Sequence, residues 1–420
     1  MILLFFIPLL IVFNIFLCFF GGTRKHILLI FFSIIQLLYL CYAPLVNYFE
    51  NNPYVFNRFL SEPSTEKGLL VLFFHIISFS LGYFIISSNK NFTFFKSTGK
   101  RNYSSKSILI TFLFITFLLY LNAILSDLSL FDIIFNDDKI STLGYQGVTF
   151  WISQLADSLI ILLILSYIYK TPIKHRLLYY SISLPLFLIL GFRYRLILLI
   201  TGLFFVFVMK NKFTLRKILS LSIIFIGVFY VVMFISTNRI AFYTSNYNNI
   251  KYDFTEYRYR EIYDNTMGSL VDFALIESLD KNKSKHDYGQ TILLYPFIMA
   301  IPSKMFPDGV KPYPAPQIKA IDKALNVPRS YGQAATFVGM SYFAFNIYGV
   351  IFLSIIFGYI LRKLEFKEFN ENNLILKIAL TLALFQLYTR GYTGQFVLHL
   401  LYFIIPIYLL NKINPVKVEK

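Results

Sequence analysis

The stretch that decides the fold of this chain covers residues 177–209 and reads LLYYSISLPLFLIL-GFRYR-LILLITGLFFVFVM. Two apolar runs, 177–190 and 196–209, flank the pentapeptide Gly191-Phe-Arg-Tyr-Arg195. Each run is short for a bilayer crossing, which takes about 20 apolar residues, and one continuous helix would bury two arginines in hydrocarbon. The sequence therefore predicts a helical hairpin that turns at Gly191 and holds Arg193 and Arg195 at the external membrane surface.

The two arginines of this turn have two interpretations. A guanidinium presents a rigid planar fork that matches the oxygens of a phosphate group. Alternatively, Arg193 and Arg195 only extend their side chains toward lipid headgroups. Extension toward headgroups requires neither a glycine turn nor short helices, so the pattern favours a phosphate-binding site.

The composition defines the class of protein. Of the 420 residues, 57% are hydrophobic, 19% are aromatic and only 15% are charged. The mean hydropathy is +0.62, which predicts an all-α polytopic membrane protein. The net charge of +17 lies mostly in segments predicted to face the cytoplasm, which hold 20 lysines and arginines against four acids. This excess is the positive-inside signal and does not indicate nucleic-acid binding.

The alternation of basic and less basic loops predicts the topology. About 11 spans are expected, at residues 2–20, 27–46, 68–88, 108–125, 148–169, 177–190, 196–209, 218–235, 342–361, 374–388 and 395–410. The pattern places the N-terminus on the external side of the membrane and the C-terminus in the cytoplasm. The chain then divides into residues 1–235 with eight spans, a large external loop at 236–341, and residues 342–420 with three spans.

The large loop is long enough for a folded layer outside the membrane. Residues 253–279 have the apolar spacing of an amphipathic helix. Residues 291–301 are apolar but too short to cross the membrane, so we expect a re-entrant or surface segment. The prolines between Pro302 and Pro328 favour an extended chain after it.

No metal or other cofactor is expected. Cys18 and Cys41 both lie in apolar runs, and their number and spacing give neither a disulfide framework nor a metal-ligand pattern. The first apolar run has no charged region before it, so we expect a retained span and not a cleaved signal peptide.

A second aromatic and basic sequence, Tyr257-Arg-Tyr-Arg260, resembles the pentapeptide at 191–195. Aromatic faces stack on sugar rings and arginines pair with phosphates, so Tyr194, Tyr257 and Tyr259 are expected to contact glycan. The equally weighted alternative for the second sequence is a surface helix with ion pairs such as Arg258–Glu261. The arginines predicted at the outer face, as a pyrophosphate site, are Arg193, Arg195, Arg239, Arg258, Arg260, Arg329 and Arg390.

Asp157 is the only carboxylate inside a predicted span. An acid at that depth is expected to face the helix bundle or a water-filled cavity and to serve function. The alternative is a structural hydrogen bond with Ser153 or Gln154. His75 and His399 also lie in spans, where we expect satisfied core residues.

Glycosyl transfer would require a general base. Candidates on the predicted outer face are Asp253, Glu256, Glu261, Asp264 and Asp272. The sequence does not choose among them, but Glu256 and Glu261 lie beside the arginines and lead. Together with Asp157 they form the predicted catalytic set.

Several features of the chain resemble the Wzy-type O-antigen polymerase family. They are the large late external loop, the Gly-x-Arg element at 191–195, the Ile-Pro-Ser-Lys sequence at 301–304 followed by Lys311-Pro312, and the aromatic-Asn-x-x-Gly sequence that ends at Gly349. The resemblance covers about the second half of the chain. Lys304 stands where the family pattern has arginine.

The resemblance implies a GT-C-like membrane glycosyltransferase in a bacterial inner membrane, with the N-terminus and the large loop at 236–341 in the periplasm. It would move a growing glycan from one undecaprenyl pyrophosphate to the next lipid-linked repeat unit, on the periplasmic face and without nucleotide sugar or metal. Expected partners are a chain-length regulator and a flippase. The competing interpretations are an O-antigen ligase and a flippase or transporter of lipid-linked oligosaccharide. Transporters commonly show repeated halves, and no repeat is visible here.

Overall fold

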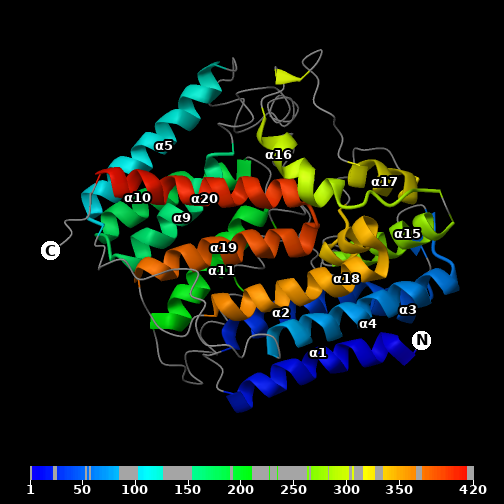
Figure 1. Ribbon diagram of the computed structural model, residues 1–420. Coiled ribbons are helices and arrows are strands. Elements are labelled where there is room, and N and C mark those ends of the chain that lie inside the picture. Colours follow the sequence, from blue (N-terminus) through cyan, green and yellow to red (C-terminus); the bar gives the residue numbers. More distant parts are fainter. Residues whose placement is uncertain are drawn as a thin grey trace. The chain divides into compact units, whose positions relative to one another are not determined.

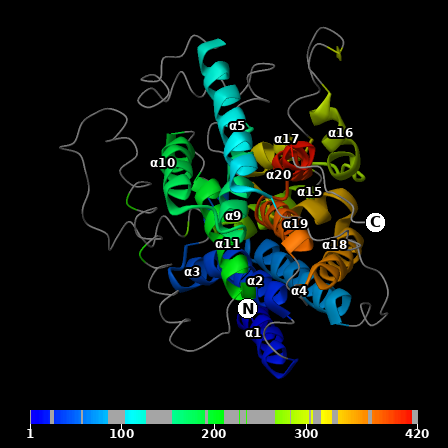
Figure 2. The same cartoon turned by 90° about the vertical axis from the view of Figure 1, so that its left-hand side faces the viewer.

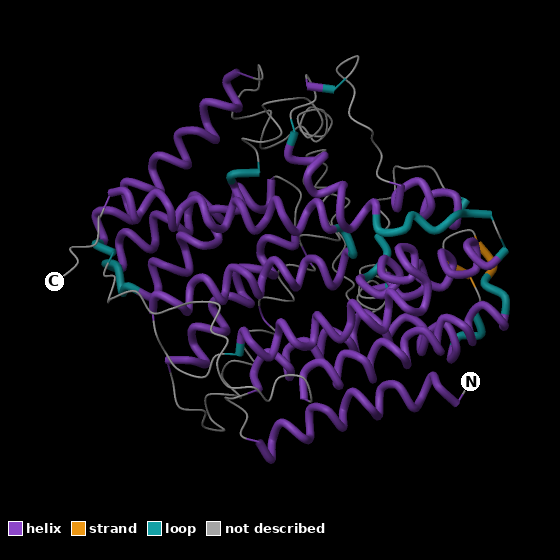
Figure 3. Tube along the Cα trace, in the orientation of Figure 1, coloured by secondary structure: helices purple, strands orange, loops and turns teal. Residues whose placement is uncertain are grey.

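A computed structural model describes the main helical segments of the chain (Figure 1). The described residues are 2–21, 26–52, 54–55, 58–84, 103–125, 154–189, 193–210, 227, 234, 263, 266–281, 283–301, 305–306, 316–326, 334–365 and 371–413. Figure 3 shows that these segments are helical apart from loops and one short hairpin. In that hairpin β1 (Tyr54–Val55) pairs antiparallel with β2 (Arg58–Phe59).

The all-α membrane class is supported by the lengths of the helices. Among the described residues, four helices are long and apolar enough to cross a membrane: Ile27–Phe49, Glu62–Phe84, Phe337–Leu364 and Thr393–Ile413. Apolar helices at Ile2–Cys18, Ser105–Leu121 and Ala156–Ile168 are shorter. The total of about 11 spans stays a prediction.

The chain forms two compact units, each assembled from distant segments of sequence. The first unit contains Met1–Lys96, Ile262–Glu368 and Ala383–Leu398. The second contains Ser97–Glu261, Phe369–Leu382 and His399–Lys420. The helices α19 (Glu371–Arg390) and α20 (Thr393–Ile413) each contribute residues to both units.

The first unit begins with α1 (Ile2–Gly21), followed by α2 (Ile27–Gln36), which continues through the π-helical turn η2 (Leu37–Tyr42) into α3 (Ala43–Phe49). The helices α4 (Glu62–Phe84) and α15 (Gly268–Asp280) follow. They are followed by η5 (Gln290–Leu294), α16 (Tyr295–Ala300), α17 (Pro316–Leu325) and α18 (Phe337–Leu364). Residues 290–300 thus form a π-helical turn and a short helix, and the predicted helix at 253–279 is observed from Gly268 onward. The prediction of an extended chain between Pro302 and Pro328 is wrong at α17. Pro316 is the first residue of this helix, where a missing N–H costs nothing, and Pro328 follows its end.

Glycines bring α4 and α18 close together, and the two helices lie side by side in both ribbon views (Figures 1 and 2). A Cβ atom added to Gly82 would lie 2.1 Å from the backbone oxygen of Ile355, and one added to Gly358 would lie 2.2 Å from that of Phe79. Glycine permits this approach of two backbones, which is a common way for helices to pack in membranes.

Two carboxylates of the first unit cap helices. Asp272 accepts hydrogen bonds from the backbone nitrogen and the hydroxyl of Thr336, at 2.8 and 2.5 Å, where α18 begins. Glu365, at the end of α18, accepts from the backbone nitrogens of Leu28 and Leu29 at 3.2 and 3.1 Å. Because the first N–H groups of a helix have no partner within it, the second carboxylate completes the start of α2.

The second unit contains α5 (Ser105–Leu125), α9 (Ala156–Ile168), α10 (Ile173–Ile189) and α11 (Arg193–Lys210), with parts of α19 and α20. The short apolar helix α9 is almost wholly buried and contacts α5, α10 and α11 (Figure 2). The stretch at 177–209 forms two helices that pack together, as predicted. The expected turn at Gly191 lies outside the described residues.

Candidate functional site

Four polar side chains meet among the apolar helices of the second unit. Asp157 lies in the first turn of α9, Tyr194 and Arg195 in the first turn of α11, and His399 in the second turn of α20. We call this group the Asp157 cluster. It joins residues that stand far apart in the sequence as separate features.

The carboxylate of Asp157 is the centre of the cluster. Its Oδ1 accepts a hydrogen bond from Arg195 Nε at 2.5 Å, and its Oδ2 lies 2.8 Å from His399 Nδ1. The hydroxyl of Tyr194 lies 3.4 Å from both carboxylate oxygens. Asp157, Arg195 and His399 are 0%, 1% and 1% exposed, so three ionisable groups are shielded from water together.

Aromatic rings surround the charged groups of the cluster. The guanidinium of Arg195 lies 5.3 Å from the ring of Tyr194, and the rings of Tyr194 and His399 are also 5.3 Å apart. Phe403, one turn after His399 on α20, stacks on the imidazole at 6.0 Å with an interplanar angle of 16°. These contacts restrict the orientation of both the imidazole and the guanidinium.

A buried charge pair of this kind requires good geometry. Burying each ion costs several kcal/mol, and the attraction repays that only when the remaining hydrogen-bonding groups are also satisfied. Asp157 meets this condition because it has a partner for each oxygen. In an apolar helix bundle such a pair is a functional-site hypothesis by default.

The environment of Arg195 differs from the expectation. The guanidinium is buried and bound to Asp157, and is not presented at a surface as the hairpin interpretation required. Of the alternative partners, Ser153 lies outside the described residues. Within them the Asp157 carboxylate bonds to Arg195, His399 and Tyr194, and no hydrogen bond from Gln154 to that carboxylate is present.

Arg390 is exposed at the end of α19 in the first unit. It precedes Gly391, whose φ of +59° forms a tight turn before α20 begins at Thr393. A Cβ atom on Gly391 would lie 2.5 Å from the backbone oxygen of Thr336. The tight turn predicted at Tyr388-Thr-Arg-Gly391 is therefore present.

Arg193 is the first residue of α11, and its side chain lies outside the described part of the structure. The other predicted site residues lie wholly outside it. They are Arg239, Glu256, Tyr257, Arg258, Tyr259, Arg260, Glu261 and Arg329.

Asp272 was one of the candidate bases. In the structure its carboxylate accepts hydrogen bonds from Thr336 at the start of α18, which is a structural role. The side chain is 1% exposed. Burial raises the pKa of its carboxyl from 3.8 to about 7, and the hydrogen bonds from Thr336 and Gly339 oppose that rise. Gly339 lies close beside it, since a Cβ atom added there would lie 2.1 Å from the Asp272 carboxylate, which would then have to shift.

The two predicted core histidines differ. His75 is fully buried in the first unit, with its ring nitrogens 2.6 Å from the hydroxyls of Ser354 and Tyr388. It is the satisfied core residue that was expected. His399 belongs to the Asp157 cluster, and sequence reasoning missed it. The signal was available, because ionisable residues in separate apolar spans commonly pair with one another.

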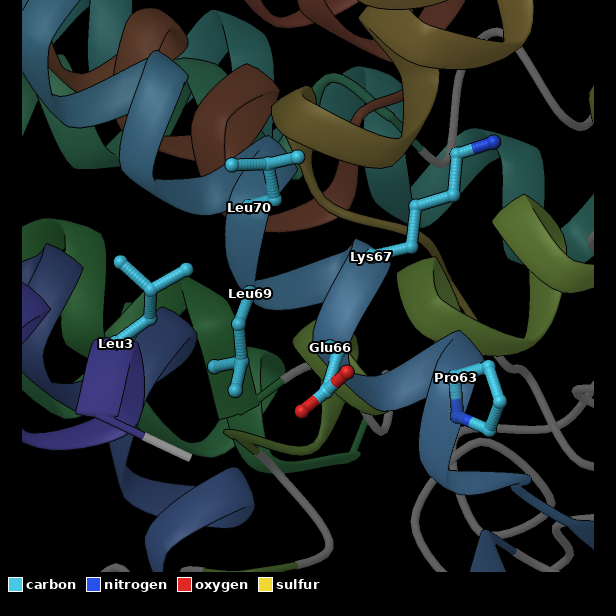
Figure 4. Close-up of a pocket in the computed structure, with 6 residues that line it drawn as sticks. All are labelled: Leu3, Pro63, Glu66, Lys67, Leu69 and Leu70. Atoms are coloured by element: carbon cyan, nitrogen blue, oxygen red, sulfur yellow. The ribbon is translucent and has the colours of Figure 1, made fainter.

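A cavity of about 500 Å³ lies in the first unit between the start of α1 and the first turns of α4 (Figure 4). It is lined by Leu3, Pro63, Glu66, Lys67, Leu69 and Leu70. Lys67 is bound to Asp280 at 2.6 Å and lies over the ring of Tyr342. Its ammonium group is therefore engaged in a structural contact within that unit.

Among the described residues, no three histidine, cysteine or acidic side chains lie close enough to hold a metal ion. Cys18 and Cys41 are both buried and free.

Comparison of the chain with protein-family models, with curated proteins and with solved structures finds no match.

Proposed function

We propose that this chain is a membrane glycosyltransferase that polymerises oligosaccharide repeat units carried on undecaprenyl pyrophosphate. In this proposal it lies in a bacterial inner membrane, with the reaction on the periplasmic face. A growing glycan leaves its pyrophosphate carrier and is joined to the next lipid-linked unit. A flippase would supply the units and a chain-length regulator would act with the enzyme.

The observation that carries the proposal is the anchoring of Arg195 by Asp157. This contact fixes the first turn of α11, in which Arg193 is the first residue. The N-terminus of a helix presents unpaired N–H groups and a partial positive charge, both of which favour phosphate. Arg193 together with this helix start is therefore a suitable place for a pyrophosphate.

The chemistry of the leaving group agrees with this arrangement. A departing pyrophosphate accumulates negative charge, and fixed cations and N–H groups aimed at that charge stabilise the transition state. Positive groups can neutralise the leaving group without donating a proton. The proposal therefore requires cations at the membrane surface and one group that takes the proton of the attacking hydroxyl.

Deletion of the gene tests this function through the surface glycan. A polymerase deletion leaves lipopolysaccharide with core and a single repeat unit on a gel. A deletion that leaves bare core indicates the competing O-antigen ligase. Restoration of the full ladder by the plasmid-borne gene is the control for effects on neighbouring genes.

A transporter of lipid-linked oligosaccharide is the second candidate, and the Asp157–His399 contact at 2.8 Å favours it. Buried acids and histidines form proton relays in membrane transporters. A deletion that accumulates the lipid-linked unit on the cytoplasmic side of the membrane would indicate transport and contradict polymerisation.

A further inference from the structure

Within the described residues, one nitrogen of the His399 imidazole has a hydrogen-bond partner, Asp157, and the other nitrogen has none. An ionised carboxylate can only accept hydrogen bonds, and Asp157 is held beside the Arg195 guanidinium. The hydrogen between Asp157 Oδ2 and His399 Nδ1 therefore belongs to the imidazole. In the neutral ring this leaves a lone pair on Nε2.

The available nitrogen is buried. His399 Nε2 is shielded from solvent and has no hydrogen-bond partner in the described segments, in a side chain that is 1% exposed. A buried acceptor without a partner costs about 1–3 kcal/mol. His75 avoids that penalty, because each of its nitrogens has a hydroxyl partner. The comparison separates a structural histidine from one with an unused basic atom.

The surroundings of His399 are suited to a ring that gains and loses a proton. The titratable and charged groups of the described residues that contact His399 or its partner Asp157 are Asp157 from α9, Tyr194 and Arg195 from α11, and Tyr402 on α20, which interacts electrostatically with Asp157. Asp157 balances the charge of an imidazolium, and Arg195 keeps Asp157 in place. Tyr194 and Phe403 contact the ring and fix its orientation.

We propose that His399 Nε2 is the proton acceptor of the reaction and that Asp157 is a positioning residue that orients the imidazole; this rests on the proposed glycosyl transfer. The hydroxyl oxygen of the acceptor sugar forms a bond to the anomeric carbon of the donor. The bond from that carbon to the pyrophosphate oxygen breaks, and the pyrophosphate leaves with the electron pair. The hydroxyl proton moves to Nε2, and the imidazolium later releases it to water.

Two substitutions separate this role from a structural one. In His399→Asn, the amide nitrogen takes the place of Nδ1 and can still donate to Asp157, but nothing replaces Nε2. In His399→Gln, the longer side chain carries its amide toward the place of Nε2, and an amide does not accept a proton at neutral pH. His175→Gln in the same unit is the control, since His175 contacts Ser105 at 3.1 Å outside the cluster.

The assay uses detergent-permeabilised membranes of the deletion strain, in which the accumulated lipid-linked repeat unit is the substrate. Full-length wild-type or variant protein is added at equal amounts, and the glycan ladder is followed with time at several pH values. We expect both His399 variants to lose about 10²- to 10⁴-fold in rate, the usual contribution of a general base. The wild-type rate should fall with acidification, and His175→Gln should match wild type.

Each result has a defined meaning. Wild-type rates in His399→Asn would overturn the inference and leave the polymerase intact. A wild-type rate that does not fall with acidification would overturn it even if both variants fail to fold. Absence of any ladder from wild-type protein, with an unchanged ladder in the deletion strain, would overturn the proposed function itself.

Discussion

Arg195 Nε donates to Asp157 Oδ1 at 2.5 Å, so a contact between residues 38 positions apart joins the start of α9 to the start of α11. Both side chains are almost completely buried. The contact determines where the first turn of α11 lies, and with it the position of Arg193. Arg195, which was expected to bind phosphate, therefore supports the position of Arg193.

Removal of one partner of this pair should destabilise the protein. Arg195→Ala leaves Asp157 as a buried charge without its cation, and breaking a buried pair in this way costs about 3–5 kcal/mol. The double variant Asp157→Leu/Arg195→Met removes both charges and should recover most of that loss. Thermal unfolding of the purified protein in detergent measures the difference. If the double variant is no more stable than Arg195→Ala, the pair does not act as a unit.

The two arginines of the pentapeptide should respond differently to lysine. Lysine has no Nε–H in the position that contacts Asp157, so Arg195→Lys should lower stability and protein abundance. Arg193→Lys should keep abundance and reduce chain elongation about 30- to 1,000-fold, which corresponds to about 2–4 kcal/mol for a lost donor to a transition state. Immunoblots and lipopolysaccharide gels from matched expression test both. A normal ladder from Arg193→Lys would mean that chain elongation does not need the planar guanidinium of Arg193.

The predicted topology can be tested with single cysteines. Lys285 and Ser104 are both exposed, and the predicted topology puts them on opposite sides of the membrane. An impermeant thiol reagent should label Lys285→Cys in intact spheroplasts and should label Ser104→Cys only after permeabilisation. The native cysteines are buried, so the unsubstituted protein is the background control. Labelling of both positions in intact cells would contradict the predicted topology.

Stability should depend on pH through Asp272. Its pKa is raised by burial from 3.8 to about 7, so between these values the folded state binds more protons than the unfolded state. The stability of the folded state should therefore fall as pH rises from about 4 to about 7 and change little above that. Asp272→Asn keeps an acceptor for the Thr336 N–H and cannot ionise, so its melting temperature should vary less over this range. An identical pH dependence in both proteins would contradict the assignment.

The close packing of α4 and α18 should not tolerate a methyl group. The added Cβ of Gly82→Ala would lie 2.1 Å from the backbone oxygen of Ile355. Because this atom belongs to the backbone, a change of side-chain rotamer cannot relieve the clash. Overpacking typically costs about 1–3 kcal/mol, so a lower melting temperature is expected. Gly227→Ala is the matched control because a Cβ atom there meets nothing within 4 Å among the residues that the structure describes. Equal melting temperatures of the two variants would show that the helices can separate locally.

The helices could be predicted well from the sequence because their signal is local. Apolar runs and the arginines at 193–195 predicted two helices on either side of the pentapeptide, and α10 and α11 end and begin there. The tight turn at Gly391 was also readable, since glycine readily adopts a positive φ. The total number of spans depends on segments outside the described residues and stays a prediction.

The candidate site was only partly predictable because its contacts link distant segments. Asp157 was recognised as unusual by its position in an apolar run, but nothing near it in sequence reveals Arg195 as its partner. His399 was expected to be a satisfied residue like His75, and only the three-dimensional arrangement shows which nitrogen of each ring is occupied. The sequence identifies residues that are costly to bury, and the fold determines how they are paired.

Glu365 supplies the carboxylate that receives the Leu28 and Leu29 N–H groups, and this has a consequence for biogenesis. The start of α2 is synthesised early, whereas its acceptor emerges only after most of the chain has left the ribosome. The first helices are therefore synthesised before this acceptor exists. We expect the contact to form late in assembly, and a truncated chain that ends before Glu365 lacks the acceptor of the Leu28 and Leu29 N–H groups.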